Sequence, residues 1–130
     1  MFNDPKGPIE HFSWAKFIVT GTEHSKSFDG KVGKGKDIRL LGNKVTRWKE
    51  RAGHLLTKEM ITGVFDENVE VLIIGSGVEG RIECPEKVKD YIHSRGITDL
   101  EIIKTPSACM LYNRLFRQGI RVAMLAHGTC

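Results

Sequence analysis

Long hydrophobic runs are missing from this 130-residue sequence. No apolar stretch reaches the roughly 18 residues that a membrane-spanning helix needs. The opening residues, Met1 to Pro8, contain charges, prolines and a glycine where a secretory signal would have an apolar segment. We therefore expect a cytoplasmic protein that does not associate with a membrane.

Cysteine is scarce as well. The three cysteines, Cys84, Cys109 and Cys130, are odd in number and not closely spaced, which argues against a disulfide framework and for a reducing compartment. A structural zinc site needs four ligands, whereas the C-terminal segment offers only His127 and Cys130. We therefore predict no metal and no cofactor.

Motifs for catalysis and for nucleic-acid binding are also missing. The sequence has no recognisable spacing of serine, histidine and aspartate and no pair of carboxylates that it places together, so nothing in it indicates hydrolytic chemistry. Cys130 as a nucleophile would require a base, for which His127 is the only neighbour in the sequence. Trp48 would be available to stack on bases, but no helix-turn-helix, zinc-finger or RNP motif supports a nucleic-acid partner.

Positive charge is distributed unevenly. Residues 31–51 carry eight basic and two acidic side chains, a net charge of +6, although the whole chain has only +4. Such a basic band suits phosphates or an acidic partner. The alternative is a solvated hairpin whose lysines protect its edges against pairing with other chains.

The second half of the sequence contains a regular alternation of helices and strands. A nearly all-apolar run, residues 69–75, predicts a strand that is buried on both faces. The other elements predicted here are a second buried strand at 100–103, a last strand at 120–126, and helices at about 58–66, from Pro85 to Gly96 and from Thr105 to Gly119. This order predicts a parallel core sheet with right-handed crossovers.

The first half is rich in predicted strands. Residues 1–10 are expected to form a loose tail, and residues 11–19 a strand or a strand pair. A short strand is expected near residues 28–32. Residues 37–41 and 44–48 flank Gly42-Asn43, a two-residue link typical of a β-hairpin. The sequence thus predicts one α/β domain over residues 11–130 with a β-rich N-terminal addition.

The glycine-rich loop after the central strand, residues 75–80, has the pattern G-x-G-x-x-G. A dinucleotide-binding loop requires a helix that begins within this motif and an acidic residue after the second strand. Here Pro85 places the helix start several residues later, and Lys104 follows the second strand. We therefore do not expect a nicotinamide or flavin cofactor. Two interpretations remain: a tight turn that needs the conformational freedom of glycine, and a small anion site formed by backbone amides.

Several motifs occur in an order that is typical of one family. They are Trp14 with Val19-Thr20-Gly21, Val45 to Trp48, His54-Leu55-Leu56, Val71 to Gly77, His93 to Ile97, Tyr112 to Leu115, Gly119 to Val122 and His127 to Cys130. From about Phe12 onward the sequence resembles the Mth-type domain family, which includes the adipogenesis-associated Mth domain protein and a mitochondrial complex I assembly factor. The combination of an I-I-G-x-G strand and loop, a Y-N-x-L helix and a terminal H-x-T-C carries the resemblance.

The resemblance implies a three-layer α/β domain. Its central sheet is mixed and mostly parallel in the C-terminal half, with flanking helices and an added N-terminal antiparallel β layer. The resemblance implies no known enzyme activity, and the roles known in the family concern assembly and regulation. The residues that match positions lining the family's shared cleft are Trp48, His54, Gly75, Ser76, Gly77, Thr105, Asn113 and His127.

We therefore expect a non-enzymatic binding or assembly protein with an unidentified protein partner, or with a second copy of itself as a homo-oligomer. The surfaces expected to serve this role are the C-terminal edge of the sheet and the basic hairpin. The alternative is an enzyme or a small-anion binder centred on Gly75 to Gly77, with Thr105 and His54.

Overall fold

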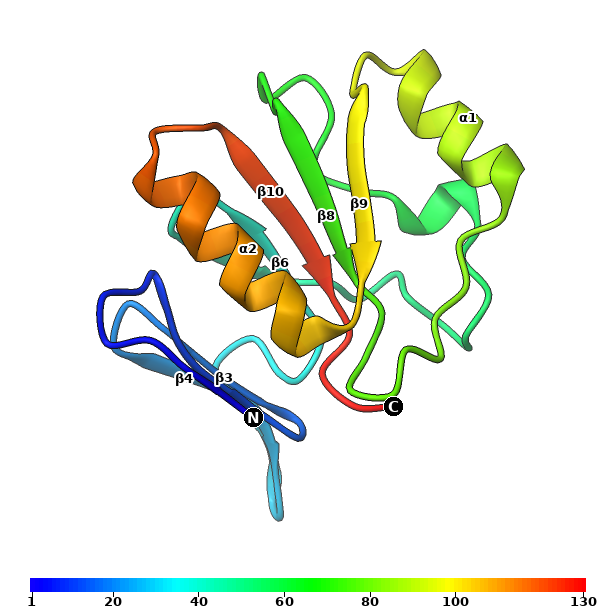
Figure 1. Ribbon diagram of the computed structural model, residues 1–130. Helices are drawn as coiled ribbons and strands as arrows, with labels where there is room; N and C mark the ends of the chain where they lie inside the picture. The colour runs from blue at the N-terminus through cyan, green and yellow to red at the C-terminus, as the bar shows by residue number, and fades with distance from the viewer.

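The computed structural model describes residues 1–130, which form two five-stranded β-sheets and two α-helices (Figure 1). The N-terminal sheet is an antiparallel meander in which each strand pairs with the next one along the chain. Its strands are β1 (Phe2–Asn3), β2 (Ile9–Ser13), β3 (Lys16–Val19), β4 (Thr22–Ser27) and β5 (Gly30–Val32). Of the two alternatives for residues 11–19, a strand or a strand pair, the pair is present, and so is the strand near residues 28–32, whereas β4 lies in a stretch for which no strand was predicted.

The second sheet is mixed and has the order β7-β6-β10-β8-β9. Its strands are β6 (Ile38–Leu41), β7 (Lys44–Arg47), β8 (Val71–Gly75), β9 (Asp99–Ile103) and β10 (Val122–Ala126). The strands β9, β8 and β10 run parallel, whereas β6 is antiparallel to both β10 and β7. This arrangement confirms the predicted hairpin, the central strand and the predicted mixed sheet that is mostly parallel in the C-terminal half.

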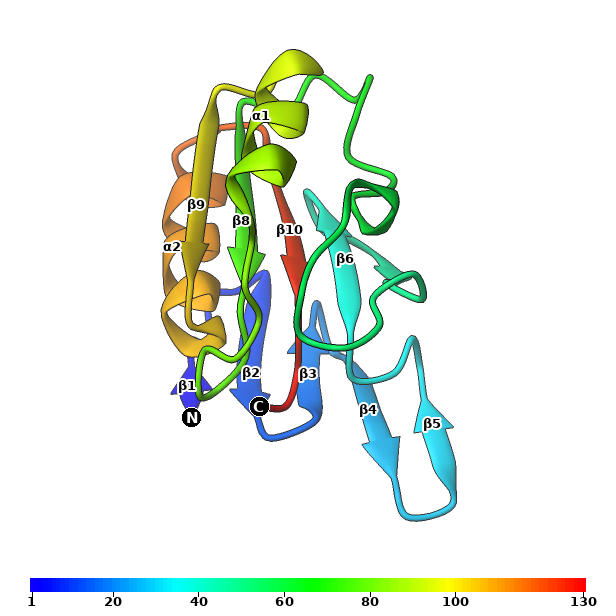
Figure 2. The ribbon, with the colours of Figure 1, turned by 90° about the vertical axis from the view of Figure 1, so that its right-hand side faces the viewer.

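The layers on the two faces of this sheet differ. Helix α2 (Thr105–Arg117) and the N-terminal sheet cover one face, and helix α1 (Glu86–Ser94) lies over the other (Figures 1 and 2). Because successive side chains of a strand point to opposite faces, Ile73 of β8 packs toward α2, whereas Leu72 and Ile74 pack toward α1. The central strand therefore contributes to two separate hydrophobic cores, as its all-apolar sequence predicts.

The first ten residues do not form the loose tail that the sequence predicts. Phe2 pairs with Phe12 across β1 and β2, and Ile9 is fully buried. The amide of Asn113 on α2 holds this segment, because its oxygen accepts from Ile9 N at 2.9 Å and its nitrogen donates to Ile9 O at 2.8 Å. A side chain 104 residues away thus orders a segment that has no strong structural signal of its own.

The prediction of a helix at residues 58–66 is also wrong. Only one short 3₁₀ turn, η1 (Lys58–Met60), is present, and Gly63, Asp66 and Asn68 have φ angles of +70°, +62° and +56°. These left-handed residues end any right-handed helical path. The apolar pattern nevertheless reflects burial, since Ile61 and Val64 lie in the core beneath α1.

The strand at residues 99–103 is not a buried strand as predicted. It is β9, which lies at the edge of the second sheet and pairs only with β8. Its residues are exposed or half-buried, in contrast to the five buried residues of β8. The apolar residues of β9 therefore reflect partial burial against the two cores, Leu100 and Ile102 on the α1 side and Ile103 on the α2 side, and not a central position in the sheet.

Candidate functional site

Three parallel strands end at the same edge of the second sheet, and the predicted site residues follow them. Gly75 closes β8 and leads into Ser76 and Gly77, Thr105 comes two residues after β9, and His127 directly follows β10. This carboxyl edge is where open α/β sheets commonly bind ligands. Figure 1 shows the C-terminal end of the chain beside the loop that follows β8.

The Thr105 hydroxyl joins these three segments. It donates to His127 O at 2.7 Å and accepts from Gly77 N at 2.8 Å, and the Thr105 side chain is fully buried. Gly75 joins them because its carbonyl oxygen accepts from His127 N at 2.9 Å, and a Cβ there would make a tight contact of 3.0 Å with the Thr105 hydroxyl oxygen. The motif residues Gly75, Gly77, Thr105 and His127 thus belong to one hydrogen-bonded unit.

The backbone amides of the glycine-rich loop are already used inside the protein. Ser76 N donates to Ile103 O at 2.8 Å, and Val78 N donates to Thr129 O at 2.7 Å. Gly77 N is bound to Thr105, and a Cβ on Gly77 would collide with the backbone of Cys130. The C-terminal segment therefore occupies the position where an anion would contact this loop, so the structure offers no free amide cradle here. Helix α1 begins only at Glu86, which agrees with the rejection of a dinucleotide site.

The last four residues bring a histidine and a cysteine next to His54. The Sγ atom of Cys130 lies 3.1 Å from Nε2 of His54 and 3.8 Å from Nε2 of His127. The two imidazole rings meet edge to face, with their centroids 6.1 Å apart. His127 is buried, Cys130 is half-buried and His54 is exposed, so this His54–His127–Cys130 cluster opens to solvent on the His54 side.

Asp37 orients the His127 ring. Its Oδ1 accepts from His127 Nδ1 at 2.8 Å and from Gly128 N at 3.0 Å, while its Oδ2 accepts from Arg51 Nε at 2.9 Å. Burial opposes ionisation of Asp37, but the hydrogen bonds from His127 and Gly128 and the charge of Arg51 outweigh it and hold the pKa of Asp37 well below its usual range. In the neutral imidazole, donation from Nδ1 to this carboxylate leaves the lone pair on Nε2, which faces Cys130.

Asp37 should therefore make stability depend on pH. Because its pKa is lower in the folded state, its stabilising contribution is complete above about pH 4 and is lost as the pH falls further. We expect Asp37→Asn to lower the free energy of unfolding at pH 7 by about 1–3 kcal/mol and to reduce the loss of stability between about pH 4 and pH 2. Urea titrations across that pH range measure both effects.

The control for this prediction is Glu59→Gln, which changes an exposed carboxylate that has no ion-pair partner. It should leave both the stability and its pH profile close to those of the unchanged protein. Equal acid profiles for the Asp37→Asn variant and the unchanged protein would contradict the role assigned to Asp37.

Two of the predicted site residues lie elsewhere. Trp48 is 1% exposed in the core beneath α1, where its Nε1 donates to Met60 O at 2.8 Å, so it presents no face for stacking on bases. Asn113 lies in the other core and holds Ile9. In exchange, the site includes Asp37 and Arg51, which sequence reasoning assigned only to the charged band. The one feature of the sequence that could have drawn attention to Asp37 is that it is a carboxylate at the start of an otherwise basic hairpin.

A basic pocket of about 210 Å³ includes Asp37 in its lining and lies between the segment that leads from β5 into β6 and the end of β7 with the residues after it. Its lining residues are Lys31, Lys34, Gly35, Lys36, Asp37, Arg47, Trp48, Lys49 and Arg51. Lys31, Lys34, Arg47 and Lys49 are exposed, and none of the four has a carboxylate within ion-pair distance. The positive charge of the band is therefore concentrated around one hollow instead of being spread along a hairpin edge.

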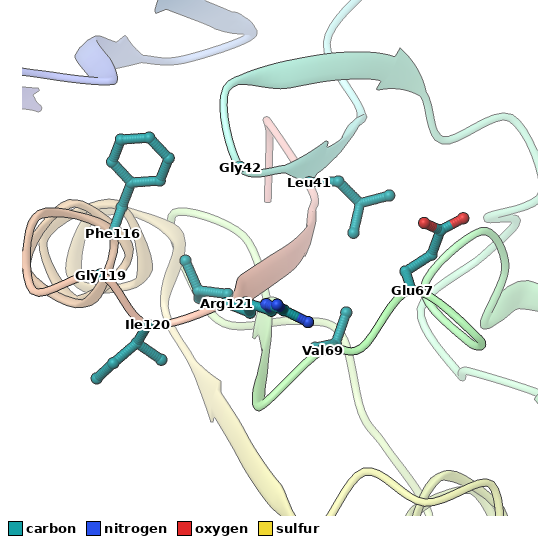
Figure 3. Close-up of a pocket in the computed structure, with 9 residues that line it drawn as sticks. Leu41, Gly42, Glu67, Val69, Phe116, Gly119, Ile120 and Arg121 are labelled. Carbon is teal, nitrogen blue, oxygen red and sulfur yellow. The ribbon is translucent and has the colours of Figure 1, made fainter.

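A larger and more apolar hollow of about 460 Å³ lies at the opposite end of the sheet. Leu41, Val69 and Glu67 line one side of it and Phe116 and Ile120 the other (Figure 3). It adjoins the start of β10 and thus the amino ends of the parallel strands. None of the predicted site residues lines it.

The fold and the site together define an α/β protein with an N-terminal antiparallel sheet, a mixed second sheet and a C-terminal segment that closes the loop after the central strand. The chain belongs to the family described as "Protein of unknown function (DUF498/DUF598)", whose model matches residues 9–127. This match confirms the resemblance to the Mth-type domain family. Neither helix has the length and hydrophobicity that crossing a bilayer requires.

Three solved structures share this fold. The first is a conserved hypothetical protein, PH1505 from Pyrococcus horikoshii OT3, with a TM-score of 0.74 and 20% identity, which covers 94% of this chain and 98% of that one. The second is MT938, with a TM-score of 0.70, 23% identity and coverage of 94% and 97%. The third is described as an outer membrane protein from Bartonella henselae, with a TM-score of 0.74, 22% identity and 95% coverage of each chain. At these identities the similarity shows the fold alone.

Proposed function

We propose that this protein is a non-enzymatic binding protein of the cytoplasm that recognises an acidic segment of a protein partner through its basic pocket. The observation that carries the proposal is the group of four exposed basic residues, Lys31, Lys34, Arg47 and Lys49, which surround one hollow without carboxylate partners. The one carboxylate in the lining, Asp37, is already paired with Arg51 and His127. A carboxylate-rich ligand would supply the missing negative charge.

The shape of the pocket favours a side-chain ligand over a base. At about 210 Å³ it has room for one or two acidic side chains, and its only hydrophobic lining residue, Trp48, is buried. Single-stranded nucleic acids gain much of their affinity from stacking on exposed aromatic rings, and this pocket has none. The alternative of a small-anion enzyme centred on Gly75 to Gly77 has little support, because the loop amides are bonded within the chain.

Charge reversal tests the proposal with a fluorescent peptide made of alternating glutamate and aspartate as the probe. We expect the double variant Lys34→Glu and Arg47→Glu to weaken peptide binding by about tenfold or more, because two favourable charges become repulsive. Raising the salt from about 0.05 M to about 0.5 M should weaken binding to the unchanged protein in the same direction. Fluorescence anisotropy measures both.

The matched control is the double variant Lys58→Glu and Lys87→Glu, which makes the same charge change on the α1 side of the molecule. It should change the affinity by less than about twofold, because neither lysine lines the basic pocket and salt screens charges outside it. Equal losses in both variants would show only a net-charge effect and would reject the pocket. Tighter binding of a single-stranded oligonucleotide of equal charge would contradict a protein partner. Self-association of the chain in preference to peptide binding would contradict it as well.

A further inference from the structure

The structure brings together three metal-ligating side chains that are separate in the sequence. His54 lies in the loop after β7, and His127 and Cys130 lie in the segment after β10, 76 residues beyond His54 at the farthest. One donor atom from each lies within 4.8 Å of the others. We propose that the His54–His127–Cys130 cluster is a binding site for a divalent transition-metal ion, with zinc as the ion that fits the donor set.

The two distances from the Cys130 sulfur are close to those of a tetrahedral centre. Zinc binds thiolate sulfur at about 2.3 Å and imidazole nitrogen at about 2.0–2.1 Å, so tetrahedral angles place the two donor atoms about 3.6 Å apart. The observed distances from Cys130 Sγ, 3.1 Å to His54 Nε2 and 3.8 Å to His127 Nε2, lie on either side of that value. The His54 ring is exposed, and it would have to shift on binding so that the two imidazole nitrogens, which lie within 4.8 Å of each other, approach to the roughly 3.3 Å that two zinc–nitrogen bonds require.

The surroundings of His127 prepare it as a ligand. Asp37 fixes the ring through Nδ1 and leaves Nε2 directed at the cluster, which is the carboxylate–histidine arrangement seen around zinc sites. The Thr129 hydroxyl lies 3.2 Å from Nε2 of His127, the atom that would bind the ion, and would have to yield this contact to it. The Cys130 backbone is held as well, since Arg81 N donates to its carbonyl oxygen at 3.1 Å.

The ligand types select the class of ion. Two imidazoles and a thiolate are borderline or soft donors, which favour zinc and its neighbours over magnesium and calcium. Three protein ligands leave a fourth position, and the solvent-exposed side at His54 gives water or a ligand access to it. This inference goes beyond the proposed function and does not depend on it, because the site needs no partner protein.

The experiment uses the full chain without a histidine tag, stripped with a chelator and titrated with zinc chloride in a calorimeter. We expect one zinc ion per chain and a rise in the unfolding temperature on binding. Cobalt(II) in place of zinc should give a thiolate charge-transfer band that disappears in Cys130→Ser. Asp37→Asn should weaken zinc binding by about 10–100-fold, and His54→Ala by more than that.

Two variants serve as matched controls. Cys84→Ser and His93→Ala remove a cysteine and a histidine outside the cluster and should keep the full zinc affinity. Since His54 is exposed, His54→Ala should fold like the unchanged chain, which a metal-free unfolding curve verifies. Zinc binding that persists in both His54→Ala and Cys130→Ser would overturn the proposal. Absence of binding up to about 100 μM zinc would overturn it too.

Discussion

Replacement of Gly77 by alanine is expected to lower the free energy of unfolding by about 2–5 kcal/mol. Two effects combine in this value. The residue has a φ angle of +105°, which an alanine adopts only with strain, and its Cβ would collide with the backbone of Cys130. The C-terminal segment must then move, and the hydrogen bond from Val78 N to Thr129 O is lost with it. Urea denaturation measures the change.

Gly96 offers a matched control for the Gly77 variant. It follows α1 with a φ angle of +97°, close to that of Gly77, but no atom lies within 4 Å of the position that an added Cβ would take. Gly96→Ala should therefore cost only the backbone strain, about 1–2 kcal/mol. Equal costs in the two variants would show that the C-terminal segment does not press on the loop.

The second large effect is expected at Thr105. Thr105→Val keeps the shape of the side chain but removes the hydroxyl, which leaves Gly77 N and His127 O without a partner in a buried position. Each unpaired buried group costs about 1–3 kcal/mol, so we expect a loss of about 2–5 kcal/mol in the free energy of unfolding. Thermal and urea unfolding should agree on this loss.

Thr105→Ser separates the hydroxyl from the methyl group. Serine retains both hydrogen bonds, so its cost should stay below about 1.5 kcal/mol, the upper end of the range for removal of one buried methyl group. The two unpaired groups also belong to the loop and the segment that carry the His54–His127–Cys130 cluster. Amide hydrogen exchange at Gly77 and Val78 should accelerate in the valine variant and not in the serine variant; equal rates in the two would contradict the hydroxyl bridge.

Much of the fold could be predicted because the signals are local. The Gly42-Asn43 link joins β6 to β7, Pro85 directly precedes α1, and Gly119 follows α2 closely with a φ angle of +80°. Each signal acts through the backbone of a few neighbouring residues. At residues 58–66 the spacing of apolar residues predicted burial correctly but not a helix, because residues with left-handed backbone angles interrupt the segment.

The candidate site was predicted less completely. Gly75, Ser76, Gly77, Thr105 and His127 do lie at one edge of the sheet, because parallel strands end together. His54 lies in the long loop between β7 and β8 and reaches them only through the path of that loop. The loop is held there by a hydrogen bond that Glu83 N donates to His54 O at 2.7 Å. No local pattern reports such a contact.

The amino-acid sequence by itself indicated most of the strands, both α-helices and the family, and it argued against a nucleotide site at the glycine-rich loop, although it missed β1 and β4 and predicted a further helix that does not form. These features depend on side-chain periodicity and on turn residues, which act over short distances along the chain. Only the tertiary structure decided that the C-terminal segment fills that loop and that Asp37, His54, His127 and Cys130 meet. The contact between Asp37 and His127 spans 90 residues, and its energy comes from burial and hydrogen bonding that exist only once both sheets are packed.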